Sequence, residues 1–473
     1  MSVTTLANGV EIGRRALQAQ QTALQVTSHN IANANTPGFS RRNVELENVA
    51  GGLGGVGGGV DAAAVTRQRD QFLDAQMRAE RQVLGRWSAL ERALTGVEAI
   101  FNEPAGAGSS EAGTIFNETS GLGLSGSLSR FWNAWQDLAN VPESGAARAA
   151  VRQEADFMVT TLHQLDTQLA DLRGSLDQEV IAQVDEINQI LDSLAAINGE
   201  IPRSVFDGGT GGDLLDQRDR LLEDLSERVD ISILEKDNGQ VSVLLAGHNL
   251  VQANQSVHLA SRTINQDDLA TSTIFFSDDG SLVPIREGEL RGLMEVRDVT
   301  IPDFQNRLDT IAATMVEEVN RIHRTGTGLT GTSGVDFFEN SKMAASNISL
   351  DDRIIADLNN ISASGDGNAG DNGVALQIAG LRNDDSLGAL GGDTIEGFYF
   401  TLLGEVGSRS KEAQTMAENH RLFSSQIENR RQSVQGVSLN DEAAQLVLFQ
   451  RAYQAAARTV SIIDDLMEVT INL

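Results

Sequence analysis

The feature that most constrains this chain is a pair of heptad stripes, one at each end. Near the start, apolar residues recur every seven positions, at Val3, Val10, Leu17, Leu24 and Ile31. Near the other end the same spacing is kept by Leu439, Leu446, Tyr453, Val460 and Met467, with a second row at Phe449, Ala456 and Ile463. An apolar repeat of seven residues is typical of a coiled-coil seam. The two ends are therefore predicted to be helices that need each other.

The first stripe is too narrow to support a helix by itself. Its neighbouring heptad positions are small or polar, at Gly13, Gln20, Thr27 and Ala34. A helix over residues 3–35 with so little apolar surface is marginal in water. Pro37 and Gly38 should end it, because proline opposes continuation and glycine tolerates positive φ. We expect assembly to order the ends, which would be disordered in the monomer beforehand; pairing within one copy and pairing between copies both remain open.

Charge and composition narrow the function further. The net charge is −30, of which residues 1–50 carry +1 and residues 404–473 carry −2, so the middle carries −29. Near-neutral ends allow copies to approach, whereas an acidic middle argues against binding nucleic acid. The chain contains no cysteine, which excludes disulfides, thiolate catalysis and cysteine-ligated zinc.

Membrane and secretion signals are also missing from the pattern. We find no apolar run of about 18 residues or more, so membrane insertion is not expected. Residues 1–30 lack a basic start, a continuous apolar run and a clear cleavage site. A cleaved Sec-type signal peptide is therefore not expected, and export would need another route.

Apolar periodicity predicts a mainly α fold. Helices are expected over residues 70–100, 128–139, 146–197, 213–229, 290–322 and 394–433. Gly199 and Pro202 should stop the longest of them. Period-two patterning with Asp-Asn-Gly and Asp-Asp-Gly turns predicts two hairpins, over 231–245 and 273–285. Residues 102–126 and 325–393 are predicted to be largely irregular.

These elements suggest three domains. Residues 1–35 plus 437–473 would form a terminal coiled-coil domain. Residues 36–229 plus 286–436 would form a middle domain built as a bundle of long helices with loops. Residues 230–285 would be a small β insert.

A search for chemistry gives no positive case for an enzyme. The glycine run 51–59 formally matches a dinucleotide fingerprint, but no cleanly capped helix follows it. His248 and His258 lie in the β insert without helical spacing, and Gln377 stands where a calcium loop from Asp366 would need glutamate. P-loop, HExxH and GxSxG motifs are absent. We predict no catalytic, metal or cofactor site.

The most specific stretch runs from His29 to Arg41 and is rich in asparagine. An ordinary helix stop accounts for Asn35 to Gly38. It does not account for Asn30 and Asn33, which lie within the predicted helix. Side-chain amides at these positions suit hydrogen bonds to a neighbouring copy.

This stretch resembles the axial proteins of the bacterial flagellum. Asn30-Ile-Ala-Asn33 followed by Thr36-Pro-Gly-Phe39 is similar to a segment shared by the rod and hook members of that family, although Phe39 replaces the commoner tyrosine. The Thr-Pro-Gly-Phe-Ser-Arg form resembles the hook-associated members. Further segments that resemble them are 65–73, 214–221 and 438–458.

The resemblance implies a structural protein that forms the hook–filament junction by self-assembly and joins hook to filament. The implied partners are further copies in a ring, the hook protein, hook-associated protein 3 and an export chaperone, without nucleic acid, cofactor or metal. The implied location is extracellular, after type III export without a cleaved signal peptide. The residues expected at the N-terminal assembly interface are Val10, Leu17, Leu24, Asn30, Ile31, Asn33, Asn35, Thr36, Pro37, Gly38 and Phe39. Those expected at the C-terminal interface are Leu439, Leu446, Phe449, Tyr453, Ala456, Val460, Ile463 and Met467.

Two alternatives stay open at this point. A hook or distal-rod protein would share the terminal segments but not residues 214–221. A secreted enzyme on a helical scaffold would need convergent histidines or carboxylates within residues 200–400.

Overall fold

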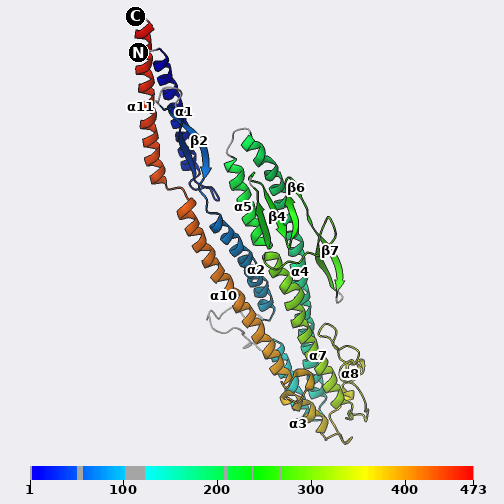
Figure 1. Cartoon of the computed structure of the whole chain (residues 1–473). Helices are drawn as coiled ribbons and strands as arrows, with labels where there is room; N and C mark the ends of the chain where they lie inside the picture. Colours follow the sequence, from blue (N-terminus) through cyan, green and yellow to red (C-terminus); the bar gives the residue numbers. More distant parts are fainter. Residues whose placement is uncertain are drawn as a thin grey trace.

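The computed structural model describes residues 3–50, 57–101, 123–206, 211–236, 238–266 and 269–471. The molecule is elongated, with both termini at one end and helices α3, α7 and α8 at the other (Figure 1). The fold is mainly α, as predicted. Among the described helices, none is long and apolar enough to cross a membrane.

The two ends of the chain lie side by side. Helix α1 (Val3–Asn33) runs along helix α11 (Leu439–Ile471) for most of its length. Strands β1 (Arg42–Asn48) and β2 (Val60–Arg67) form an antiparallel hairpin that packs on α1. The heptad stripes therefore correctly predicted two helices that pair, here within one copy.

Long helices build the middle of the molecule around one continuous core. Helix α2 (Gln71–Phe101) lies antiparallel to α10 (Ile395–Gln435), and beside them stand α3 (Leu124–Asn140) and α5 (Gly212–Arg228). Helix α6 (Glu289–Glu295) continues through a π-helical turn, η2 (Val296–Thr300), into α7 (Ile301–His323). The core is completed by large side chains, among them the fully buried Trp132 and Trp135.

Helix α4 (Gly145–Phe206) is longer than the sequence predicted, because it runs through Gly199 and Pro202. The expected stop at these residues is wrong. A proline removes the N–H that would bond the carbonyl four residues earlier, which here belongs to Asn198. That carbonyl instead accepts a hydrogen bond from Gln240 Nε2 at 2.9 Å. Ile201 is fully buried, so packing holds the last turns together.

Strands β5 to β8 cover one side of α4. A four-stranded antiparallel meander comprises β3 (Ile231–Glu235), β4 (Val241–Leu245), β5 (His248–Gln252) and β6 (Gln255–Ser256). Its first hairpin is the one predicted, with Ile231 opposite Leu245. A separate hairpin joins β7 (Leu259–Gln266) to β8 (Leu269–Phe276).

The second predicted hairpin forms only in part. Residues 273–276 lie in β8, and the chain turns at residues 277–279, so that Phe276 N donates to Ser281 O at 2.9 Å and Val283 N donates to Ile274 O at 3.0 Å. Phe275 bridges Leu282 on this edge of β8, while the other edge pairs along its full length with β7. Pro284 offers no backbone N–H to extend the shorter pairing.

Residues 325–393, predicted to be largely irregular, contain only short elements: α8 (Asp352–Ala356), η3 (Leu358–Asn360), α9 (Gly373–Gly380), η4 (Leu381–Asn383) and η5 (Gly388–Leu390). Buried polar side chains of α7 hold them. His323 is fully buried, which lowers its pKa to about 4 and keeps the ring neutral. Its Nδ1 donates to Val335 O at 2.7 Å and its Nε2 accepts from Ser362 N at 2.8 Å.

Candidate assembly interface

Close packing of α1 on α11 depends on small residues of α1. A Cβ atom added to Gly13 would lie 2.3 Å from Val460 Cγ2, and one added to Gly9 would lie 3.0 Å from Ile463 Cδ1. Atoms this close overlap, so the two helices approach through the glycines. At Gly13, a small heptad position next to the predicted stripe, the structure leaves no room for a side chain.

The predicted stripe residues lie at the edge of this contact. Those of the N-terminal stripe are partly buried: Val10, Leu17, Leu24 and Ile31. Those of α11 that face α1 are also partly buried: Leu446, Phe449, Ala456, Val460, Ile463 and Met467. Leu439 and Tyr453 remain exposed, at 51% and 38%. The most buried residues of α1 are others, namely Leu6, Ala19, Ala23, Thr27 and Asn30.

Asn30 joins three elements inside one copy. Its Nδ2 donates to Arg42 O at 2.9 Å and to Glu442 Oε2 at 3.1 Å, while its Oδ1 accepts from Arg42 N at 3.0 Å. Arg41 Nε donates to the other oxygen of Glu442 at 2.6 Å. The Glu442 side chain is fully buried. The Asn30 amide therefore holds the end of α1, the start of β1 and the first turn of α11 together, rather than presenting free groups to another copy.

The rest of the asparagine-rich turn is local and largely exposed. Asn33 Nδ2 donates to His29 O at 3.0 Å, and Thr36 Oγ1 donates to Asn33 Oδ1 at 3.2 Å. Phe39 is partly buried, with its ring 5.4 Å from that of His29. The exposed residues of the turn are Asn35, Thr36, Pro37 and Gly38, and Gly38 has a φ of +75°.

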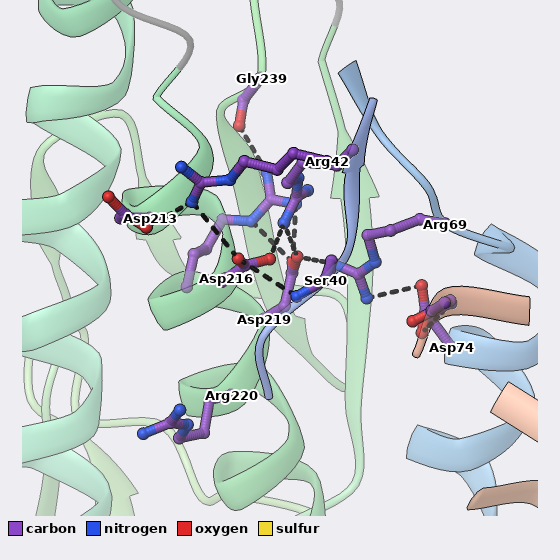
Figure 2. Close-up of polar contacts among 12 residues, drawn as sticks. Ser40, Arg42, Arg69, Asp74, Asp213, Asp216, Asp219, Arg220 and Gly239 are labelled. Carbon is purple, nitrogen blue, oxygen red and sulfur yellow. Dashed lines mark hydrogen bonds and ion pairs between the residues drawn. The ribbon is translucent and has the colours of Figure 1, made fainter. Parts of the chain in front are cut away.

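A row of aspartates on α5 binds the terminal part of the chain to the middle. Asp213, Asp216 and Asp219 are spaced three apart and thus share one helix face. Arg42 pairs with Asp213 (Figure 2). Arg67 Nη1 lies 2.8 Å from Asp216 and 3.0 Å from Asp219.

The ion pairs extend from α5 to α2 through Arg69. Arg69 pairs with Asp219 and, at 2.5 Å, with Asp74 (Figure 2). Arg218 also donates to Asp219, and burial lowers the pKa of this guanidinium to about 10, so it keeps its charge at neutral pH. We call these charged groups the joint. They are Arg42, Arg67, Arg69, Asp74, Asp213, Asp216, Arg218 and Asp219.

The sequence did not predict the joint. Residues 214–221 served only as a point of resemblance, although they lie on α5 within the acidic row. The available signal was the spacing of three aspartates on one predicted helix, with arginines clustered at 41–42 and 67–69. That these charges meet is a fact of tertiary structure.

A cleft of about 1210 Å³ lies beside the joint. It is bounded by the turn at residues 34–41, by α5 and by the last turns of α10. Arg220 Nη2 donates to Pro37 O across it. Arg431 of α10 pairs with Glu223 of α5 on the same side. Its walls are charged and polar, which suits a hydrated joint between two parts of a molecule.

One group among the described residues has the composition of a metal site. His248, Asp278 and Asp279 place ligand atoms within 4.8 Å of one another. His248 Nε2 lies 2.9 Å from Asp278 Oδ2, an ion-pair contact that already accounts for their proximity. Both aspartates are exposed, and His258, the other histidine of the insert, contacts Asp192 instead. Nothing in this arrangement assembles a nucleophile, a base and an anion-stabilising group.

Family models match the chain in three places. The helical domain of the flagellar hook-associated protein FlgK matches residues 109–338. The flagella basal body rod protein model matches residues 11–39, and the C-terminal model of the basal body rod FlgEFG proteins matches residues 431–473. The rod models thus match only the ends.

Full-length relatives and one solved structure agree with these models. Flagellar hook-associated protein 1 of Bacillus subtilis is 30% identical over 529 aligned positions, covering 99% of both chains. The protein of that name from Salmonella typhimurium is 24% identical and covers 97% of this chain and 98% of its own. The hook junction protein FlgK from Burkholderia pseudomallei has the same fold, with a TM-score of 0.64 at 15% identity over 76% of this chain and 100% of that one. This chain belongs to the flagellar hook-associated protein 1 (FlgK) family.

Proposed function

We propose that this protein is a structural subunit of the bacterial flagellum that self-assembles at the hook–filament junction and joins hook to filament. Membership of the hook-associated family supports this role. The observation that carries the assembly mechanism is the outer face of α11. Its large apolar residues stay exposed although α1 covers the opposite face: Leu439, Val447, Leu448, Ile462, Leu466 and Val469. A helix that is apolar on both sides is a helix that a further partner must cover.

Residues 1–35 and 437–473 form the assembly unit in this proposal, residues 36–229 with 286–436 the body, and residues 230–285 an insert. Copies would pack in a ring around the flagellar axis through the exposed face of α11 and the exposed turn at residues 35–38. The predicted interface residues that face α1 or α11, and Asn30, would hold each copy's own terminal pair together. The hook protein would contact the ring on one side and hook-associated protein 3 on the other. Before assembly, an export chaperone would cover the exposed face of α11.

The proposed location is outside the cell, in the axis of the flagellum, after export through the type III apparatus without a cleaved signal peptide. The narrow α1–α11 contact supports this route, since a chain must unfold to pass a narrow channel and marginal terminal helices unfold readily.

The direct test is electron microscopy of cells that lack the protein. We expect intact hooks without filaments, and flagellin lost to the medium. Normal filaments on such cells would contradict the junction role.

A double substitution tests the assembly mechanism. Leu448→Asp with Ile462→Asp should abolish filament growth while the protein is still exported and folded, because both side chains are largely exposed, at 64% and 59%, and fill no core. Counting filaments and measuring the exported protein check this. The matched control is Leu376→Asp, an exposed leucine of the middle domain (44%) that should leave filaments unchanged.

The alternatives receive less support. A hook or distal-rod identity would not explain the match of residues 109–338 to the hook-associated helical domain. The cluster at His248 supports no enzyme, because its side chains pair with one another on an exposed turn.

A further inference from the structure

A second cavity adjoins the joint. It has a volume of about 580 Å³ and lies between β2, the start of α2, α5 and the first two strands of the meander. Arg69 and Asp219 of the joint line both this cavity and the cleft described above. We call it the arginine pocket, because Arg67, Arg69, Arg78 and Arg218 all line it.

Positive charge exceeds negative charge in the arginine pocket. Its four arginines share the walls with three carboxylates, those of Asp74, Asp219 and Glu235. Each carboxylate is already engaged. Asp74 pairs with Arg69 at 2.5 Å. Arg218 Nη2 lies 2.7 Å from Asp219 and 3.1 Å from Glu235. The pocket therefore carries a net positive charge within a chain whose own net charge is −30.

Arg78 of α2 lacks a carboxylate partner. Its side chain makes no ion pair or hydrogen bond with a residue that the structure describes, although it is partly buried. Burial lowers the pKa of this guanidinium, which still stays charged at neutral pH. The Nε of Arg69 is also buried, and no described atom accepts its hydrogen bond. Two guanidiniums of one pocket thus have donors to spare.

The remaining walls of the pocket strengthen its field. They are apolar, and two of their side chains, Leu222 and Val241, are only 1% exposed. Charges attract each other more strongly beside such walls than in bulk water. The planar fork of an arginine also matches the paired oxygens of an oxyanion better than it matches a spherical halide.

We propose that the arginine pocket binds a small divalent oxyanion of the phosphate or sulfate class, held by Arg78 and by the Nε of Arg69. The bound ion connects α2 to the segment that follows β2, so it stiffens the connection between the terminal hairpin and the middle helices. This site belongs to a single copy of the chain, and it does not depend on the role at the hook–filament junction.

Calorimetric titration of the purified full-length protein with inorganic phosphate tests the site. Sodium chloride keeps the ionic strength constant throughout. We expect saturable binding of one phosphate per chain, and a higher melting temperature in phosphate than in chloride. The absence of saturable heat, or a melting temperature that follows ionic strength alone, would overturn the proposal.

Removing the free guanidinium should remove the binding. Arg78→Gln should weaken phosphate affinity about tenfold or more, because it deletes charge-assisted hydrogen bonds. The matched control is Arg321→Gln on α7, which makes the same change of charge at a side chain that is 63% exposed and far from the pocket in sequence. Equal affinity in the parent and in Arg78→Gln would contradict the assignment.

A change of the opposite sign keeps the test independent of any loss of folding. Glu235→Gln removes a negative charge from the wall of the pocket and leaves Arg78 in place. It should tighten phosphate binding, and unchanged or weaker binding would show that the charge of this pocket does not attract the ion.

Hydrogen–deuterium exchange locates the bound ion. Phosphate should slow exchange in the segment after β2 and in the first turns of α2, and it should leave α7 unchanged. Protection confined to other elements would place the ion elsewhere and overturn the proposal.

Discussion

At the scale of single residues, one buried carboxylate connects the two ends of the chain. Glu442 is fully buried and accepts hydrogen bonds from Asn30 of α1 and from Arg41 at the start of β1. A buried charge is tolerated only when its partners are in place. Glu442 therefore fixes where α11 begins relative to α1, and Asn30 serves that contact.

Glu442→Gln should loosen the terminal pair. The substitution leaves the Arg41 guanidinium without its carboxylate, which costs about 3 kcal/mol for a buried pair. Hydrogen–deuterium exchange should show faster exchange in α1 and α11 with little change in the middle. The neighbouring Asp441→Asn is the control, because the Asp441 side chain is exposed and should have almost no effect. Equal exchange in both variants would contradict the role of Glu442.

At the scale of elements, the terminal helices are held by a close approach at Gly9 and Gly13 rather than by a broad apolar seam. Gly13 leaves no room for a side chain against Val460. The larger stripe residues beside it are only partly buried. A narrow contact of this kind stabilises the pair modestly and is sensitive to any added volume.

Gly13→Ala should therefore weaken the α1–α11 pair. Alanine gains about 0.5–1 kcal/mol over glycine in a helix, but overpacking costs about 1–3 kcal/mol, so the clash wins by about 1 kcal/mol. Exchange protection of both terminal helices should fall.

Two comparisons check this cause. Gly174→Ala in α4, where an added Cβ meets nothing within 4 Å, should be neutral or stabilising. Val460→Ala added to Gly13→Ala should recover protection, because it makes room for the new methyl group. A failure of the second variant to recover would show that the effect does not come from the clash with Val460.

At the scale of the whole molecule, the β1–β2 hairpin that packs on α1 meets the middle helices through charges. Arg42, Arg67 and Arg69 reach from this hairpin and the segment after it to Asp213, Asp216 and Asp219 of α5, beside the cleft. Ion pairs need a defined geometry, and buried charges need their partners in place. The joint therefore holds the two parts at one angle.

Asp216→Asn with Asp219→Asn should broaden the range of that angle. Spin labels on Gln76→Cys of α2 and Gln450→Cys of α11, both exposed positions, report the distance between the parts. We expect a single narrow distance distribution in the parent protein and a wide one in the double variant. Asp224→Asn, on the same helix and outside the acidic row, should keep the narrow distribution. A wide distribution in the parent would contradict a fixed joint.

The sequence by itself determined the helices, because periodicity is a local property. The heptads at Val10 and Leu446 marked two terminal helices, the turn at Asp237-Asn-Gly marked the first hairpin, and the asparagine-rich turn pointed to the family. Local signals failed where a distant group intervened. Helix α4 passes Pro202 because Gln240 bonds the carbonyl that proline leaves free. The second predicted hairpin stays short, and β7 pairs along the other edge of β8.

Only the tertiary structure decided what each predicted site residue contacts. Periodicity cannot tell which side of a narrow stripe faces its partner, and the structure buries Gly13 against Val460 while Leu17 stays partly exposed. Asn30 meets Glu442, which is 412 residues away in sequence, and the arginines of the hairpin meet the acidic row of α5. Such contacts depend on how whole elements pack, so no local pattern contains them. The stripes predicted that the ends would pair. Only the tertiary structure shows which face of α11 contacts α1 and which face stays exposed.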